Sequence, residues 1–158
     1  FARMPKPKMK KILINDIINN VINLHELSET KIKFSFSNNN SKNYIKGDDG
    51  QLNRVFINLI KNSIESINEK IKKDEDFKGK INIDIKEDNT YIFVKITDNG
   101  IGFGKVNKTK MLTPYFTTKK NGTGLGLAIV TKIINDHNGS ISFNSLKEGA
   151  EVEIILPK

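Results

Sequence analysis

The sequence has 158 residues, 37% of them hydrophobic and 28% charged, which suits one globular domain with a sizeable core. The absence of cysteine excludes disulfides and thiolate metal sites, and charged residues or asparagines interrupt every apolar run that could span a membrane. The net charge of +8 admits a phosphate-rich partner. The lysines are scattered, however, with few aromatic residues among them, so we interpret most of them as solvated surface.

The first half of the chain is predicted to contain two helices and two strands. Pro5 and Pro7 indicate an extended start, so residues 1–10 are interpreted as a linker. Apolar residues then recur at helical spacing, which predicts a helix, and further on they alternate with polar residues, which predicts strands. A long apolar stripe at helical spacing follows, and Asp48 or Asp49 could cap the start of that helix. The predicted elements are a helix over 12–27, strands over 31–37 and 44–46, and a helix over 50–72.

The second half is predicted to contain two hairpins, with an irregular segment and a helix between them. Residues 99–122 show no regular period, which is typical of a mobile functional loop in a compact domain. The expected fold is an α/β (α+β) two-layer sandwich, one sheet with helices on one face. The predicted elements are strands over 81–85 and 92–96, a helix over 123–136 with Asn138-Gly139 as its C-cap, and strands over 140–145 and 151–156.

The long helix carries a polar stripe opposite its apolar one. Asn58, Lys61 and Asn62, with Glu65 a turn further on, are spaced by three or four residues and so share one side. A solvated polar face is one interpretation. Because two asparagines are poor helix formers, the alternative is a site for phosphates and a hydrated Mg²⁺, which takes few protein ligands.

Two glycine clusters flank the irregular segment. Asp98 ends a predicted strand and precedes Gly100 and Gly102, which could be an ordinary turn. The alternative is a fixed carboxylate that selects a donor such as an exocyclic amine, beside backbone that a flat ligand can approach. Further on, the alternating glycines of 122–126 open a predicted helix, and a helix N-terminus is a natural phosphate site.

Other nucleotide and metal motifs are absent from the sequence. No P-loop, Rossmann fingerprint or eukaryotic-type protein-kinase set is present. His25 and His137 lie far apart in the sequence without nearby ligand partners, so both are interpreted as structural or surface residues.

Four stretches, taken together and in order, resemble the catalytic, ATP-binding domain of bacterial sensor histidine kinases. Residues 51–67 (QLNRVFINLIKNSIESI) are similar to the N box of that family, and 98–102 (DNGIG) to its first glycine box. Residues 114–119 (PYFTTK) are similar to the phenylalanine box, and 122–127 (GTGLGL) to the second glycine box. The opening FARMPKP is similar to the junction after the dimerisation helices in the NtrY-like nitrogen-regulation branch.

The resemblance implies the Bergerat ATP-binding fold, a mixed sheet with helices on one face and a flexible ATP lid between Phe103 and Asn121. Asp98 is expected to accept a hydrogen bond from the adenine amine, Gly100 and Gly102 to admit the purine, and Asn62 to ligate Mg²⁺. The remaining expected ATP contacts are Asn58, Lys61, Thr117, Thr118, Lys119, Gly122, Thr123, Gly124, Leu125 and Gly126.

The resemblance also implies what lies outside the chain. Residues 1–10 would be the linker from a dimerisation and phosphoacceptor domain, and 11–158 the catalytic domain, in the cytoplasmic part of a sensor anchored in the inner membrane. The acceptor histidine is not expected in this chain, so the fragment should bind ATP as a monomer without completing phosphotransfer. Its expected partners are the dimerisation domain and a response regulator, with neither nucleic acid nor direct membrane contact.

Two positions depart from common family variants, and two other functions compete. Glu65 stands where many members carry Lys or Arg, and Ala150 where Thr or Ser is frequent. Other Bergerat-fold ATPases place Glu one turn before the Mg²⁺-binding Asn, where this chain has Asn58; without that general base, efficient hydrolysis is not expected. The basic net charge keeps a nucleic-acid-binding module as a third hypothesis.

Overall fold

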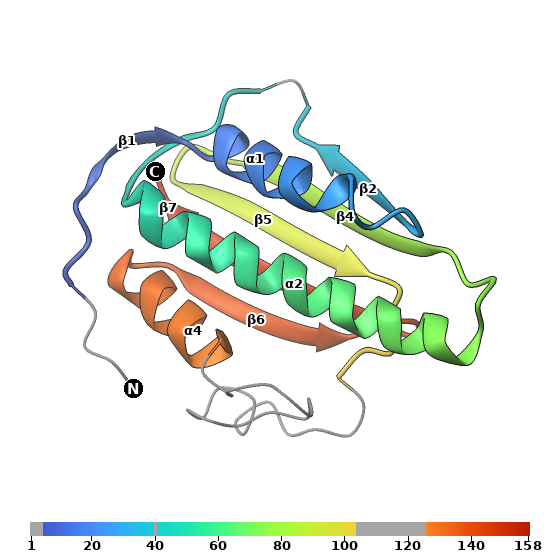
Figure 1. The fold of residues 1–158 in the computed structure, drawn as a ribbon. Coiled ribbons are helices and arrows are strands. Elements are labelled where there is room, and N and C mark those ends of the chain that lie inside the picture. Colours follow the sequence, from blue (N-terminus) through green and yellow to red (C-terminus); the bar gives the residue numbers. More distant parts are fainter. Residues whose placement is uncertain (1–4, 40, 104–125) are drawn as a thin grey trace.

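A computed structural model describes residues 5–39, 41–103 and 126–158, and Figure 1 shows the chain path. The elements are β1 (Lys10–Leu13), α1 (Ile14–Glu26), β2 (Ile32–Ser37), β3 (Tyr44–Gly47), α2 (Asp49–Lys73), β4 (Gly79–Glu87), β5 (Tyr91–Asp98), α4 (Gly126–Asp136), β6 (Ser140–Ser145) and β7 (Ala150–Pro157). In the described part of the chain, no helix has both the length and the apolar composition needed to cross a bilayer.

Two layers make up the domain. Five strands form one mixed sheet in the order β2-β4-β5-β7-β6, in which β2 and β4 are parallel and the other neighbours antiparallel. Helices α1, α2 and α4 lie side by side over one face of this sheet (Figure 1). Strands β1 and β3 form a separate antiparallel pair. The predicted two-layer sandwich with helices on one face is confirmed.

Helix α2 is the centre of the helical layer because its apolar stripe is continuous. Leu52, Val55 and Phe56 are fully buried, and the stripe continues to Ile67. Asp48 caps the helix, since its carboxylate accepts a hydrogen bond from the Gln51 N–H at 3.1 Å. The helix is one residue longer at each end than the predicted 50–72. Its register on the sheet therefore fixes which of its side chains face β5.

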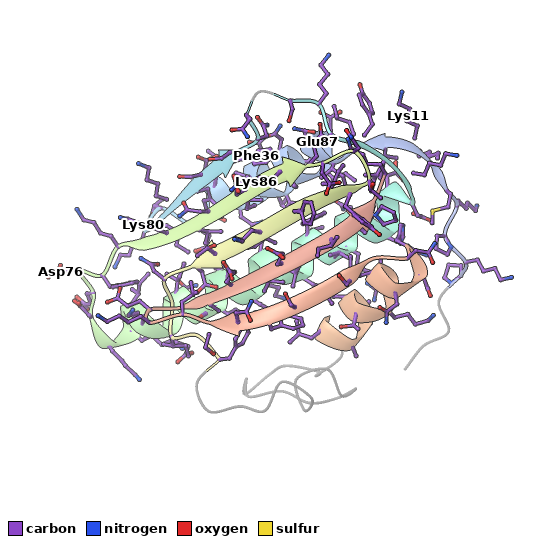
Figure 2. All side chains as sticks on the ribbon, turned by 180° about the vertical axis from the view of Figure 1, so that it is seen from behind. Lys11, Phe36, Asp76, Lys80, Lys86 and Glu87 are labelled. Carbon is purple, nitrogen blue, oxygen red and sulfur yellow. The ribbon has the colours of Figure 1, made fainter. Side chains whose placement is uncertain are left out.

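None of the described helices covers the second face of the sheet, as the view from behind shows (Figure 2). Along β4, Ile81, Ile83 and Ile85 are buried, whereas Lys80 and Lys86 point to the uncovered face. This alternation buries one side of the strand and hydrates the other. It is the pattern that allowed the strands to be predicted.

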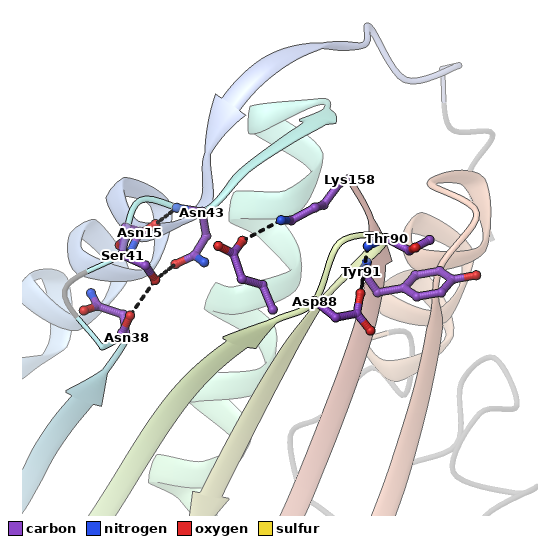
Figure 3. A network of polar contacts seen from close by, with 9 residues as sticks. Asn15, Asn38, Ser41, Asn43, Asp88, Thr90, Tyr91 and Lys158 are labelled. Carbon is purple, nitrogen blue, oxygen red and sulfur yellow. Dashed lines mark hydrogen bonds and ion pairs between the residues drawn. The ribbon is translucent and has the colours of Figure 1, made fainter.

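A polar network closes the end of the sheet where β5 begins (Figure 3). Asn15 accepts a hydrogen bond from the Asn43 N–H at 2.8 Å and donates to the Ser41 carbonyl at 3.0 Å. The Lys158 ammonium lies 3.1 Å from the Glu87 carboxylate; Lys158 and then Asn43 hold the pKa of Glu87 below its ordinary value. Because Asp98 ends β5, this network stabilises the end of the sheet remote from that residue.

The predicted start of the first helix is wrong. The helix expected from residue 12 begins at Ile14, because Ile12 and Leu13 belong to β1, where Ile12 pairs with Ile45. The predicted C-cap at Asn138-Gly139 is confirmed: Asn138 has φ 59°, and the Gly139 N–H bonds the Ile134 carbonyl at 2.9 Å. The division of the chain at residue 10 stays a prediction.

Candidate functional site

Asp98 is a buried carboxylate at the end of β5, and this end of the strand lies beside the second half of α2 (Figure 1). One oxygen accepts a hydrogen bond from the Gly100 N–H at 2.9 Å. Burial raises the pKa of Asp98 above its ordinary value of 3.8, while hydrogen bonds from the Gly100 N–H, the Ser63 hydroxyl and the Ala150 N–H oppose this shift. The carboxylate is thus desolvated, and a further donor would stabilise its charged form.

The two glycines after Asp98 are required by close contacts. A Cβ on Gly100 would lie 2.3 Å from the Ser66 hydroxyl oxygen and 2.6 Å from the Ser66 carbonyl carbon, so the chain crosses α2 with no room for a side chain. Gly102 has φ +74°, and a Cβ there would lie 2.7 Å from the Gly149 carbonyl oxygen. These positions fix the backbone where a planar ligand was predicted to approach.

The polar stripe lies on α2, the helix that contacts the first glycine box through Ser66. Asn58 and Asn62 are half-buried and Lys61 is exposed, as expected for one partly hydrated side of the helix. Ser63 follows Asn62 directly in the chain, and its hydroxyl acts to lower the pKa of Asp98. The structure therefore places the first glycine box against the second half of α2, the helix that also carries the predicted N-box residues. Glu65, also half-buried, belongs to this stripe.

The second glycine cluster is described only at its end. Gly126 is the first residue of α4, which packs against α2, and a Cβ on Gly126 would meet no heavy atom of the described residues within 4 Å. Phe103, at the start of the predicted lid, packs edge-to-face on Phe143 with ring centroids 5.9 Å apart. The predicted lid over 104–121 and seven predicted contacts lie outside the described residues: Thr117, Thr118, Lys119, Gly122, Thr123, Gly124 and Leu125.

Both histidines have structural surroundings. His137 is 2% exposed; its Nδ1 lies 2.8 Å from the Ile133 carbonyl oxygen, and its Nε2 accepts a hydrogen bond from the Asp48 N–H at 3.0 Å. His25 Nδ1 lies 2.9 Å from the Val21 carbonyl oxygen of its own helix. Across the part of the chain that the structure describes, no three His, Cys, Asp or Glu residues gather into a possible metal cluster.

Some residues of the site were missed at the sequence level. Ser63 and Ser66 are on α2, three residues apart, and both contact the first glycine box. Their only sequence signal was this spacing beside the apolar stripe, which does not identify a partner. Gly149 lies in the turn between the paired strands β6 and β7 and has φ +92°; a Cβ there would clash with the Asp98 carbonyl oxygen, a contact that the sequence does not reveal.

A groove of about 460 Å³ between α1 and α2 is separate from this site. Ile17, Val21, Leu24 and Ile57 supply its apolar lining, and none of the predicted site residues lines it. The groove therefore takes no part in the nucleotide hypothesis.

The sequence matches a known family and named relatives. Residues 47–158 match the family described as histidine kinase-, DNA gyrase B- and HSP90-like ATPase. A putative sensor histidine kinase NtrY-like from Rickettsia conorii is 36% identical over 98% of this chain and 25% of its own length. Sensor histidine kinase ZraS from Salmonella typhimurium is 35% identical over 94% of this chain and 31% of its own length. The chain thus spans about a quarter to a third of these relatives.

Solved structures agree with this assignment. The nucleotide-free catalytic domain of histidine kinase ThkA superposes with a TM-score of 0.82 at 30% identity, covering 96% of each chain. ThkA in complex with the response regulator protein TrrA matches with a TM-score of 0.79 at 28% identity, over 96% of this chain and 42% of that one. The relatives are sensor kinases and not chaperone or topoisomerase ATPases, as the first hypothesis predicted. The chain therefore belongs to the histidine kinase-, DNA gyrase B- and HSP90-like ATPase family, as an ATP-binding catalytic domain of the sensor histidine kinase type.

Proposed function

We propose that the domain binds ATP with the adenine amine donating to Asp98. The observation that carries this proposal is the desolvated carboxylate, which accepts a hydrogen bond from the Gly100 N–H at 2.9 Å and has a pKa raised by burial. An exocyclic amine supplies a further donor at a place where water is scarce, so each hydrogen bond counts for more than in solvent. Gly100 and Gly102 leave the adjoining backbone without side chains, which suits a flat purine.

The triphosphate would extend from this point along the polar stripe of α2. Asn58 and Lys61 offer an amide and a cation, and Gly126 offers the N-terminus of α4. Asn62 provides a single neutral oxygen, which fits a Mg²⁺ ion that keeps several waters and is otherwise held by phosphates. The ion would neutralise phosphate charge, and these side chains would orient the chain of phosphates.

The reaction we propose is transfer of the γ-phosphoryl group to a histidine outside this chain. The bond from the γ-phosphorus to the oxygen of ADP breaks, and a bond to an imidazole nitrogen forms. His137 is buried with both ring nitrogens engaged, and His25 faces its own helix, so neither is presented to a nucleotide. With an amide at Asn58, no carboxylate is present there to activate water, which favours transfer over hydrolysis.

The partners follow from the same proposal. A dimerisation domain would supply the histidine, and a response regulator would receive the phosphoryl group, as the ThkA–TrrA complex suggests by analogy. We further propose that the domain itself is monomeric and belongs to the cytoplasmic part of a membrane-anchored sensor.

Calorimetric titration with a non-hydrolysable ATP analogue tests the nucleotide proposal. Asp98→Ala is expected to weaken binding by about ten- to a hundredfold, the loss of a charge-assisted hydrogen bond of roughly 1.5–3 kcal/mol. Asn62→Ala is expected to abolish the gain in affinity that Mg²⁺ gives to the wild type. Unchanged affinity of Asp98→Ala, with the fold intact by circular dichroism, would refute the adenine role.

A further inference from the structure

The four residues that follow Asp98 are all tied to neighbouring elements. The N–H groups of Gly100, Ile101 and Gly102 bond the Asp98 carboxylate at 2.9 Å, the Ser66 carbonyl at 3.3 Å and the Ser66 hydroxyl at 3.2 Å. The Asn99 N–H bonds the Lys80 carbonyl at 3.3 Å. Glycine-containing turns are flexible when nothing holds them. In this turn, by contrast, every N–H from Asn99 to Gly102 makes a hydrogen bond.

Asn99 extends the β4–β5 ladder by one step with its side chain. The regular pairing ends at Ile81 and Asp98. Beyond it, the Asn99 side-chain oxygen accepts a hydrogen bond from the Lys80 N–H at 2.7 Å, and the Asn99 side-chain nitrogen donates to the Lys78 carbonyl at 3.1 Å. The main chain can turn toward α2 directly after Asp98 because this amide keeps β4 bonded.

Lys70 of α2 secures the same turn from the other side. Its ammonium donates to the Asn99 carbonyl at 3.1 Å and lies 4.5 Å from the centroid of the Phe77 ring. Its positive charge also acts to lower the pKa of Asp98. Together with Ser66, Lys70 ties α2 to both ends of the turn, so that α2, β4 and the carboxylate form one connected unit.

We propose that Asn99 and Ser66 are positioning residues for purine recognition: they hold the backbone of the first glycine box so that the Asp98 carboxylate already faces the purine edge before nucleotide arrives. This proposal rests on the adenine role of Asp98. A pre-organised carboxylate gains affinity because binding does not have to order the turn. Loss of either anchor leaves the carboxylate in place but loosens its direction, which affects recognition of the purine amine more than contacts with the phosphates.

The experiment compares ATP with inosine triphosphate, which carries a carbonyl where adenine carries its amine. The ratio of the two affinities, measured by calorimetry, reports purine recognition and is insensitive to a uniform loss of binding. Asn99→Ala and Ser66→Ala are each expected to lower the preference for ATP by roughly fivefold or more. Asn89→Ala and Ser142→Ala are the matched controls, since Asn89 is exposed in the turn between β4 and β5, Ser142 is exposed on β6, and both variants are expected to leave the ratio unchanged.

The Asp98→Ala variant separates the two proposals. If Asp98→Ala removes the preference for ATP and the two anchor variants retain it in full, the positioning roles are wrong and the adenine role stands. If Asp98→Ala itself leaves the preference unchanged, the adenine role fails first. A fall in affinity for both nucleotides by the same factor in Asn99→Ala and Ser66→Ala would also overturn the proposal. Should Asn99→Ala not fold, Ser66→Ala decides.

Discussion

His137 of the segment after α4 and Asp48 at the start of α2 are joined by a hydrogen bond of 3.0 Å, from the Asp48 N–H to the imidazole Nε2. The Nδ1 of the ring lies 2.8 Å from the Ile133 carbonyl, which requires the proton on that nitrogen. Gly47 makes room for the ring, because a Cβ there would lie 3.2 Å from His137 Cδ2. One neutral imidazole therefore connects the end of the α4 segment to the cap of the helix that carries the N-box residues.

Replacement of this imidazole is expected to destabilise the fold. His137→Phe keeps an aromatic ring but leaves the Asp48 N–H without its acceptor, and the expected loss is about 1–3 kcal/mol in the free energy of unfolding. Urea denaturation followed by circular dichroism measures this loss. His25→Phe is the control, since His25 is half-buried and bonds within its own helix; it is expected to change stability by less than about 0.5 kcal/mol. Equal losses in both variants would contradict the linking role of His137.

The buried Asp98 carboxylate is expected to make the nucleotide-free domain less stable as the pH rises. Its folded-state pKa is raised above 3.8, so the folded protein holds this proton more tightly than the unfolded chain does. The contribution of Asp98 to stability is fully present below about pH 3.8 and is lost as the pH rises through the folded-state pKa.

A comparison with Asp98→Asn isolates this effect. The lowered pKa values of Asp48 and Glu87 act on absolute stability in the opposite direction, but they are common to both proteins and cancel in the difference. From acidic to neutral pH, the unfolding free energy of the wild type minus that of Asp98→Asn is expected to fall. A difference that rises with pH would mean that the carboxylate is stabilised, and not desolvated, by its surroundings.

Two glycines of the site are predicted to respond differently to the same substitution. Gly100→Ala places a methyl group against the backbone of Ser66. Because neither helix α2 nor the turn after β5 can easily move to relieve this contact, both thermal stability and ATP affinity are expected to fall. Gly126→Ala meets no neighbour within 4 Å among residues 5–39, 41–103 and 126–158 and adds helix propensity, so stability is expected to be kept or raised by up to about 1 kcal/mol.

The ATP affinity of Gly126→Ala tests the proposed contact between Gly126 and the phosphates. With an intact fold, Gly126→Ala is expected to lower ATP affinity severalfold because the methyl group crowds the incoming phosphates. Thermal unfolding and calorimetry on the same preparations measure both quantities. Wild-type affinity in Gly126→Ala would remove this residue from the proposed contacts, whereas a loss of stability would show that its surroundings differ from those described.

The elements that could be predicted from sequence are those with local causes. Helix α2 has an uninterrupted apolar stripe and an Asp48 cap, and its predicted bounds differ from the observed ones by a residue at each end. Strands β4 and β5 alternate strictly because one face packs under the helices. Strand β1 was missed because its pairing with β3 joins residues more than thirty positions apart, and Ile12 also fits the helical stripe that follows.

In the candidate site, too, the residues with a local sequence signal could be predicted and those that depend on tertiary packing could not. Asp98, Gly100 and Gly102 could be selected because an acid followed by glycines at a strand end is visible in a short window. Ser63, Ser66 and the side-chain bonds of Asn99 could not, since serine and asparagine are common at such positions and their roles depend on which turn of α2 packs against β5. That register is set by the whole core and not by any short motif.

The most direct test of the account is a crystal structure of the domain with a bound ATP analogue. The exocyclic amine of adenine is expected within hydrogen-bonding distance of the Asp98 carboxylate, about 2.7–3.2 Å between nitrogen and oxygen, with the phosphates directed toward Asn58, Lys61 and Asn62. An analogue bound at saturating concentration with its purine elsewhere on the domain, and Asp98 without contact to it, would contradict the central claim.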